Sequence, residues 1–282
     1  MVQPHGPASA RAAAGHERRR PPRLRPARGA LRRRGDAVPP GRAARGGAPL
    51  VRSQASARRL TVGERGWNPD LARTYDRVAR AYAEQYFTEL ERKPFDRELL
   101  DRFAAAVRGR GRVMDLGCGP GHVGRYLAER SVDVFGVDLS PGMVAVAREL
   151  NPGLRVEHGD MRALALPDAS LAGVVAFYSL IHLERASAPQ ALAEIARVLA
   201  PGGVVLLAFH GGEGEAHADD WFGQGVSVDA TLFSPEEMGR LMGQAGLAVA
   251  EILTRPPYDF EYPTQRVYAS GTRPLAALQG RM

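Results

Sequence analysis

The chain has 282 residues, enough for one large domain or two small ones, and its hydrophobic share of 44% is ordinary for a globular protein. Its net charge of +7 is unevenly spread, because residues 1–60 hold 15 arginines and two acids whereas residues 61–282 hold 23 basic and 29 acidic residues. One cysteine excludes an internal disulfide and a multi-cysteine zinc cluster, and we expect no metal site. No apolar run approaches the length that crosses a bilayer, so we expect a cytoplasmic protein without membrane contact.

Residues 1–60 are rich in Arg, Pro, Gly and Ala and carry too few large apolar side chains to offset the entropy of ordering. We interpret them as a disordered tail. A nucleic-acid-binding arm and an organelle transit peptide are alternative explanations. Lys93 is the only lysine, which suggests a GC-rich coding sequence, and we favour the interpretation that the tail is an upstream stretch outside the native folded protein.

Residues 61–282 are expected to form the folded domain. Residues 71–86 place apolar side chains at helical spacing and predict an amphipathic helix, followed by a second helix over 95–107; the two form an N-terminal helical cap. Strand and helix candidates then alternate along the chain. The strands are expected at 112–116, 132–137, 155–159, 171–178 and 204–210, and the helices at 123–130, 143–150 and 188–199. This alternation predicts βαβ units and an α/β, doubly wound parallel sheet.

Residues 211–233 are too long for a simple connection and are predicted to form a lid loop. A helix is expected over 235–245, with Ser234 as its N-cap and Glu237 completing a capping box. Two final strands are expected at 247–253 and 265–270.

A glycine-rich turn, VMDLGCGPGHVG at residues 113–124, stands between the first strand and the next helix. Gly119, Gly121 and Gly124 satisfy the G-x-G-x-x-G dinucleotide pattern, a weak match by itself. Asp115 precedes the turn, and its carboxylate would repel a pyrophosphate. A ligand with an ammonium and no phosphate would be favoured instead, and S-adenosylmethionine is such a ligand.

Two further acids follow strands. Asp138 ends the second strand candidate, where a carboxylate can accept from ribose hydroxyls, a feature that also suits NAD. Asp160 follows the third, where it can accept from the adenine amine, and the NAD pattern does not require that acid. The three acids therefore lie at the sheet edge where α/β proteins bind ligands.

Residues 75–270 resemble a class I S-adenosylmethionine-dependent methyltransferase of the branch that includes ubiquinone and menaquinone biosynthesis enzymes. VMDLGCGPG is similar to the first motif of that family, VFGVDLSPGMVAVAR to its second, and EHGDMRALALPDASLAGVVAFYSLIHL and ARVLAPGGVVLLAF to later ones. The resemblance implies a Rossmann-like sheet of seven strands, mostly parallel with the last strand antiparallel, and helices on both faces. It also implies methyl transfer from the sulfonium, with S-adenosylhomocysteine as product.

Specific roles follow from the resemblance. The methionine end of the cofactor is assigned to the turn: Asp115, Gly117, Cys118, Gly119 and Gly121, with Cys118 expected to be a small filler. The ribose is assigned to Asp138, and the adenine to Leu139, Met143, Asp160 and the Met161 backbone. Tyr75 and Tyr82 would close over the cofactor, and Tyr178 would lie beside the methyl group. Tyr75, Tyr82 and Met143 are equally compatible with plain core packing.

His182, just beyond the fourth strand, is the predicted proton acceptor, with Tyr178 as the other catalytic candidate. His182 could instead hold its loop by a backbone hydrogen bond, and His210 lies on the same edge. Our leading hypothesis is methyl transfer to an O, N or C acceptor on a small or medium-sized metabolite. RNA or other nucleic-acid methylation, and a regulatory protein that binds the cofactor without turnover, are the alternatives.

Overall fold

The computed structural model describes residues 70–275, all within one structural unit, so the predicted tail at residues 1–60 lies outside the described part. The strands of the main sheet are β1 (Val113–Leu116), β2 (Val134–Asp138), β3 (Arg155–His158), β4 (Leu171–Phe177), β5 (Leu199–Gly211), β8 (Ala248–Arg255) and β9 (Gln265–Thr272). A separate two-stranded sheet contains β6 (Glu215–Ala218) and β7 (Val228–Thr231).

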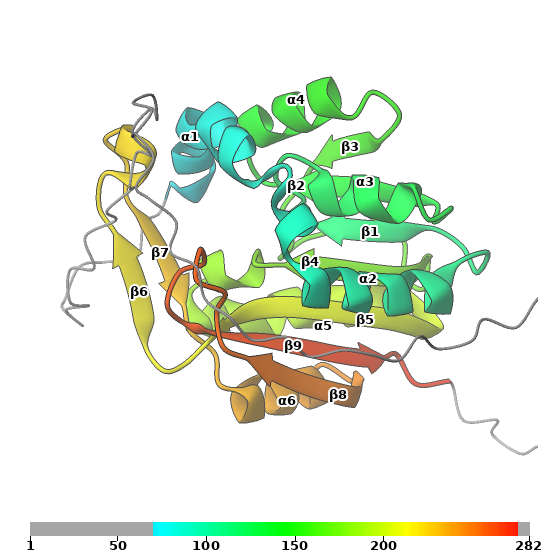
Figure 1. Ribbon diagram of the computed structural model, residues 1–282. Helices are drawn as coiled ribbons and strands as arrows, with labels where there is room; N and C mark the ends of the chain where they lie inside the picture. The colour runs from blue at the N-terminus through cyan, green and yellow to red at the C-terminus, as the bar shows by residue number, and fades with distance from the viewer. Residues whose placement is uncertain (1–69, 276–282) are drawn as a thin grey trace, which may run out of the picture. The chain divides into compact units, whose positions relative to one another are not determined.

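The main sheet has the order β3-β2-β1-β4-β5-β9-β8 (Figure 1). Strands β1 to β5 pair in parallel, whereas β9 runs antiparallel to both β5 and β8. The predicted seven-stranded sheet with its last strand antiparallel is confirmed. The carboxyl ends of β1, β2 and β4 lie side by side, and the turns that follow them converge at this edge of the sheet.

Helices cover both faces of the sheet (Figure 1). They are α1 (Leu71–Tyr86), α2 (Pro94–Val107), α3 (His122–Ala128), α4 (Pro141–Leu150), α5 (Ala188–Val198) and α6 (Pro235–Gln244), with short 3-10 turns η1 (Glu89–Arg92), η2 (Leu180–His182), η3 (Arg185–Ser187) and η4 (Trp221–Gly223).

Successive residues of a strand belong to different cores. Val113 of β1 packs with α2, α3 and α4, whereas the next residue, Met114, packs with α5 and α6. This is the two-residue alternation of a strand buried on both faces, which explains why the strands read as continuous apolar runs. Among the helices between residues 70 and 275, none combines the length and apolar character needed to cross a membrane.

The predicted lid at residues 211–233 is largely a β-hairpin, formed by β6 and β7 with η4 at its tip. The tip packs on α1: the Trp221 ring lies 5.1 Å from the Tyr75 ring, and the Phe222 ring lies 6.0 Å from the Tyr82 ring. Thr74 of α1 also donates a hydrogen bond to the main-chain oxygen of Ser227 at 3.4 Å. The hairpin strands have only four residues each and their apolar side chains are mostly alanine, so their alternation is too short and weak for the sequence pattern to indicate them.

Helix α6 begins as predicted, because the Ser234 hydroxyl accepts a hydrogen bond from the Glu237 amide at 3.1 Å. The Glu237 carboxylate itself forms an ion pair with Arg185 of η3. The helix start is therefore held both by its cap and by a contact to a neighbouring turn.

Replacing Ser234 by Ala removes this cap and should lower the free energy of unfolding by about 1 kcal/mol. Ser234→Asp supplies another capping oxygen and should retain most of that stability. Urea unfolding of the three proteins measures the difference, and equal stability of Ser234→Ala and the parent would contradict the role of the cap.

Candidate active site

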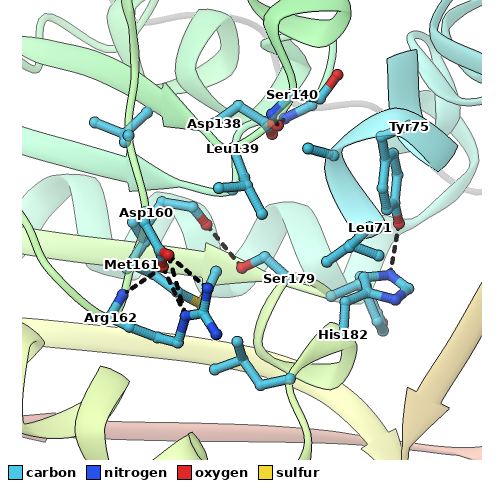
Figure 2. Close-up of a pocket in the computed structure, with 18 of the residues that line it drawn as sticks. Leu71, Tyr75, Asp138, Leu139, Ser140, Asp160, Met161, Arg162, Ser179 and His182 are labelled. Atoms are coloured by element: carbon cyan, nitrogen blue, oxygen red, sulfur yellow. Dashed lines mark hydrogen bonds and ion pairs between the residues drawn. The ribbon is translucent and has the colours of Figure 1, made fainter. Parts of the chain in front are cut away.

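A cavity of about 520 Å³ opens at the carboxyl edge of the sheet, between the ends of β1, β2 and β4 and the start of α1 (Figure 2). Its size suits a small organic ligand. The sequence-predicted residues that line it are Tyr75, Tyr82, Gly117, Gly119, Asp138, Leu139, Asp160, Met161, Tyr178 and His182. Ten predicted positions from five separate segments thus meet around one space.

The turn after β1 approaches the segment after β4 so closely that a side chain at Gly117 is excluded. Gly117 has φ +69°, and a Cβ there would lie 2.3 Å from the Cβ of Ser179. Ser179 in turn donates a hydrogen bond from its hydroxyl to the main-chain oxygen of Leu116 at 2.7 Å. Figure 2 shows the Ser179 hydroxyl directed at that oxygen. Glycine therefore lets the turn after β1 pack directly against Ser179, and the Gly117 backbone lines the cavity beside this contact.

Asp138 holds two backbone segments together at the end of β2. One carboxylate oxygen accepts from the Gly119 amide at 2.8 Å, and the other accepts from the Ser140 amide at 2.9 Å. Burial raises the pKa of this carboxyl. The carboxylate also borders the cavity, so it can accept a hydrogen bond from a hydroxyl donor there.

Asp76 of α1 is a supporting residue that the sequence reasoning missed. One of its carboxylate oxygens accepts from the Ser140 hydroxyl at 2.6 Å and from the Gly142 amide at 2.7 Å. It thereby fastens α1 to the start of α4. The sequence could have indicated this residue, because Asp76 directly follows the predicted cofactor residue Tyr75 in the TYD segment.

Asp160 is held by Arg162, a second residue that the sequence reasoning missed. The guanidinium of Arg162 makes three hydrogen bonds to the Asp160 carboxylate, between 2.7 and 3.1 Å (Figure 2). These hydrogen bonds lower the pKa of Asp160. The pair borders the cavity next to Met161, so Asp160 would meet a ligand as an ionised acceptor.

Asp115 does not line the cavity. Its side chain is 1% exposed, and one oxygen accepts from the Gly124 amide at 2.8 Å. Burial raises the pKa of this carboxyl to about 7. The residue supports the glycine-rich turn from the side away from the cavity, and its contact with a cofactor stays a prediction.

Three other predicted cofactor residues also lie behind the cavity wall. Cys118 is a buried free thiol, and Gly121 adopts φ +80° at the start of α3. Met143 packs with Ala79 and Ala83 of α1. Each shapes the wall, and direct ligand contact by any of them remains untested.

His182 has a defined tautomer. Its Nδ1 lies 2.9 Å from the main-chain oxygen of Asp229 on β7. Because a carbonyl oxygen only accepts, Nδ1 carries the hydrogen, and Nε2 accepts the hydroxyl proton of Tyr75 at 2.6 Å (Figure 2). Burial lowers the pKa of His182 to about 4, so the ring is neutral at pH 7. Both predicted roles for His182, a backbone-held loop residue and a base, are compatible with this geometry.

Tyr178 and His210 make their polar contacts with residues other than His182. Tyr178 lines the cavity, adopts φ +52°, which is unusual for a bulky residue, and has its hydroxyl 3.4 Å from that of Tyr268. His210 is not part of the cavity wall; its Nδ1 lies 3.1 Å from a guanidinium nitrogen of Arg266. Burial and then Arg266 lower the pKa of His210 to about 3. Of the two histidines, His182 is the one that borders the cavity.

Comparisons with known proteins agree with this arrangement. Residues 113–203 match the family model of a methyltransferase domain. The chain contains a class I methyltransferase domain. The malonyl-acyl carrier protein O-methyltransferase of Pectobacterium atrosepticum is 36% identical to this chain over 139 residues, 49% of the chain and 52% of the relative.

A second relative is the dTDP-3-amino-3,6-dideoxy-alpha-D-glucopyranose N,N-dimethyltransferase of Streptomyces fradiae, 33% identical over 146 residues, 50% of this chain and 53% of the relative. The chain thus spans about half the length of these curated relatives. A solved S-adenosylmethionine-dependent methyltransferase from Mesorhizobium loti shares the fold, with a TM-score of 0.51 and 22% identity over 62% of this chain and 96% of that one.

The methyltransferase domain implies S-adenosylmethionine as cofactor, and the residues of the cavity suit it. The backbone of Gly117 and Gly119 lines the cavity, the Asp138 carboxylate borders it, and Leu139 and Met161 supply apolar wall near Asp160. No group of three or more possible metal ligands occurs between residues 70 and 275.

The raised pKa of Asp115 predicts a pH-dependent stability. In the native protein this carboxyl takes up a proton below about pH 7, whereas its ordinary pKa is 3.8. The native state therefore binds more protons than the unfolded state between these two pH values. Protonated Asp115 contributes up to about 4 kcal/mol to the free energy of unfolding at low pH, and this contribution is lost as the pH rises from 4 to 7.

Asp115→Asn keeps an oxygen for the Gly124 amide and removes this titration. The free energy of unfolding of the variant, relative to that of the parent, should therefore be higher at pH 8 than at pH 5. Urea unfolding of both proteins at both pH values measures this difference. A difference between the two proteins that does not change with pH would contradict the buried, protonated Asp115.

A second prediction concerns the charge of His182. At pH 6 this ring should be neutral with the hydrogen on Nδ1, and its titration should be centred near pH 4. His217 is an internal control, because a hydrogen bond to the Asp229 carboxylate raises its pKa and keeps it protonated at pH 6. Long-range ¹H–¹⁵N NMR distinguishes these states, with His182→Gln for assignment. A charged His182 at pH 6 would be inconsistent with the structure.

Proposed function

We propose that this protein transfers a methyl group from S-adenosylmethionine to an oxygen, nitrogen or carbon acceptor on a small or medium-sized metabolite. The convergence of Asp138, Asp160 and the Gly117 backbone on one cavity is the observation that carries the proposal. The names of the two relatives support it, since one names a malonyl group on acyl carrier protein and the other an amino sugar nucleotide. We propose a cytoplasmic location, consistent with a single unpaired cysteine.

Each part of the cavity has a role in this proposal. The turn at Gly117 and Gly119 would hold the methionine end of the cofactor, Asp138 its ribose, and Asp160 with Met161 its adenine. When bound, the cofactor supplies an electrophilic methyl group on a good leaving group. The protein then has to hold the acceptor in line with that methyl, and such positioning can supply about 7 kcal/mol or more of the barrier reduction.

His182 and Tyr75 would handle the proton of the acceptor. Nε2 of His182 has a lone pair and is neutral at pH 7, but the Tyr75 hydroxyl occupies it. Burial, followed by the charge of Asp138, raises the pKa of Tyr75, so its hydroxyl stays protonated. The proton of the acceptor would therefore reach His182 through the Tyr75 oxygen rather than directly.

Two alternatives have less support. Residues 70–275 contain 21 basic and 28 acidic residues, which does not favour nucleic acid as the acceptor. A regulatory protein that binds the cofactor without turnover would need neither an acidic cavity mouth nor the Tyr75–His182 pair.

Calorimetric titration of the full chain with S-adenosylhomocysteine tests the proposal. We expect binding, and we expect Asp138→Asn to weaken it about tenfold or more, because the substituted side chain loses charge-assisted hydrogen bonds. Asp133→Asn is the matched control, since Asp133 is exposed at the opposite end of β2 and should leave the affinity unchanged. Absence of binding to the parent protein would reject the proposed function.

A further inference from the structure

The side chains that line the cavity carry more negative than positive charge. Four carboxylates border it among the described residues, namely Asp70, Asp138, Asp160 and Glu184. One arginine, Arg162, is the basic side chain in the same wall, and His182 is neutral. Asp70 is paired with Arg73 and Asp160 with Arg162, so Asp138 and Glu184 carry the remaining negative charge, against the one net positive charge that the bound cofactor would add.

Arg162 is not readily available to an anionic acceptor. Its Nε and one terminal nitrogen make three hydrogen bonds to Asp160, so a carboxylate on the acceptor would compete with a pair that is already well aligned. Glu184 is exposed on the segment after β4, makes no side-chain hydrogen bond or close ion pair to the described residues, and lies near enough for its charge to raise the pKa of Arg162. An incoming carboxylate would meet repulsion from Glu184 and no free cation in this wall.

The Tyr75–His182 pair gives an independent indication. Asp229 fixes the hydrogen of His182 on Nδ1, so Nε2 points its lone pair at the Tyr75 hydroxyl. The pair can take up one proton at the Tyr75 oxygen while the hydroxyl proton of Tyr75 moves to Nε2. A carboxylate nucleophile has no proton to lose and would not use this relay, whereas an amine or a hydroxyl does.

From these two observations we infer that the reacting group of the acceptor is an amine or a hydroxyl, and not a carboxylate. The inference rests on the proposed function and narrows its substrate class. Nitrogen or oxygen of the acceptor forms a bond to the methyl carbon, the carbon–sulfur bond breaks, and its electron pair stays on sulfur. The proton released from nitrogen or oxygen passes to the Tyr75 oxygen, and the proton of Tyr75 passes to His182.

This assignment separates the two relatives. One is named for O-methylation of a malonyl group, which ends in a carboxylate, and the other for N,N-dimethylation of an amino sugar. The charge of the cavity in this chain suits an acceptor of the second chemical kind.

The test uses three probes that share one carbon skeleton: 3-phenylpropylamine, 3-phenylpropanol and 3-phenylpropionate. Each is titrated into the full chain saturated with S-adenosylhomocysteine, and binding is followed by ligand-detected NMR. We expect the amine and the alcohol to bind at least about tenfold more tightly than the carboxylate. The inference would be overturned if the carboxylate bound as tightly as the amine and the alcohol or more tightly, or if neither the amine nor the alcohol bound.

Variants of Glu184 link the preference to the cavity wall. Glu184→Gln should reduce the difference in affinity between the amine and the carboxylate probes. Glu184→Arg should reduce this difference, called the affinity gap below, still further by supplying a free cation. Glu213→Gln is the control, because Glu213 is exposed and does not line the cavity, and it should leave the affinity gap unchanged. An unchanged affinity gap in both Glu184 variants would contradict the inference. If S-adenosylhomocysteine itself does not bind, the proposed function fails and the inference with it.

Discussion

The carboxylate of Asp138 is the constraint on which the shape of the site depends. Its two oxygens accept amide hydrogens from Gly119 and Ser140, so the turn after β1 and the start of α4 are held at a fixed separation. Asp76 extends the same hydrogen-bond system to α1 by accepting from the Ser140 hydroxyl and the Gly142 amide. Three segments that are distant in sequence are thus ordered around a single strand end, and the Asp138 carboxylate borders the space they enclose.

The same system extends from α1 to the hairpin. The position of α1 determines the position of Tyr75, whose hydroxyl donates a hydrogen bond to Nε2 of His182. The other ring nitrogen of His182 donates to the main-chain oxygen of Asp229 on β7. The Asp229 carboxylate meanwhile binds His217 of β6 at 2.5 Å. The hairpin therefore sets the tautomer of His182, and a change in its seating on α1 would alter both the cover of the cavity and the ability of His182 to accept a proton.

The sheet and its helices could be predicted because their strands are apolar on both faces and alternate with amphipathic helices; the helix expected at 71–86 matches α1 residue for residue. The hairpin could not, since its strands have only four residues each and its tip is held by aromatic contacts with α1. In the site, strand-end acids such as Asp138 follow from topology. The partnership of Arg162 with Asp160, and the occupation of His182 by Tyr75, depend on side-chain directions that spacing does not reveal.

The glycine-rich turn shows why its dinucleotide pattern is misleading. Phosphate binding at such a turn needs free backbone amides, but here the amides of Gly119, Gly121 and Gly124 donate to Asp138, to the Cys118 carbonyl and to Asp115. The sequence argument had Asp115 repel a pyrophosphate across the cavity, whereas in the structure Asp115 is buried and occupies an amide that a phosphate would need. The turn therefore disfavours phosphate because its amides already donate hydrogen bonds within the protein. The cavity suits a ligand that hydrogen-bonds to the carboxylates and the main chain of its wall.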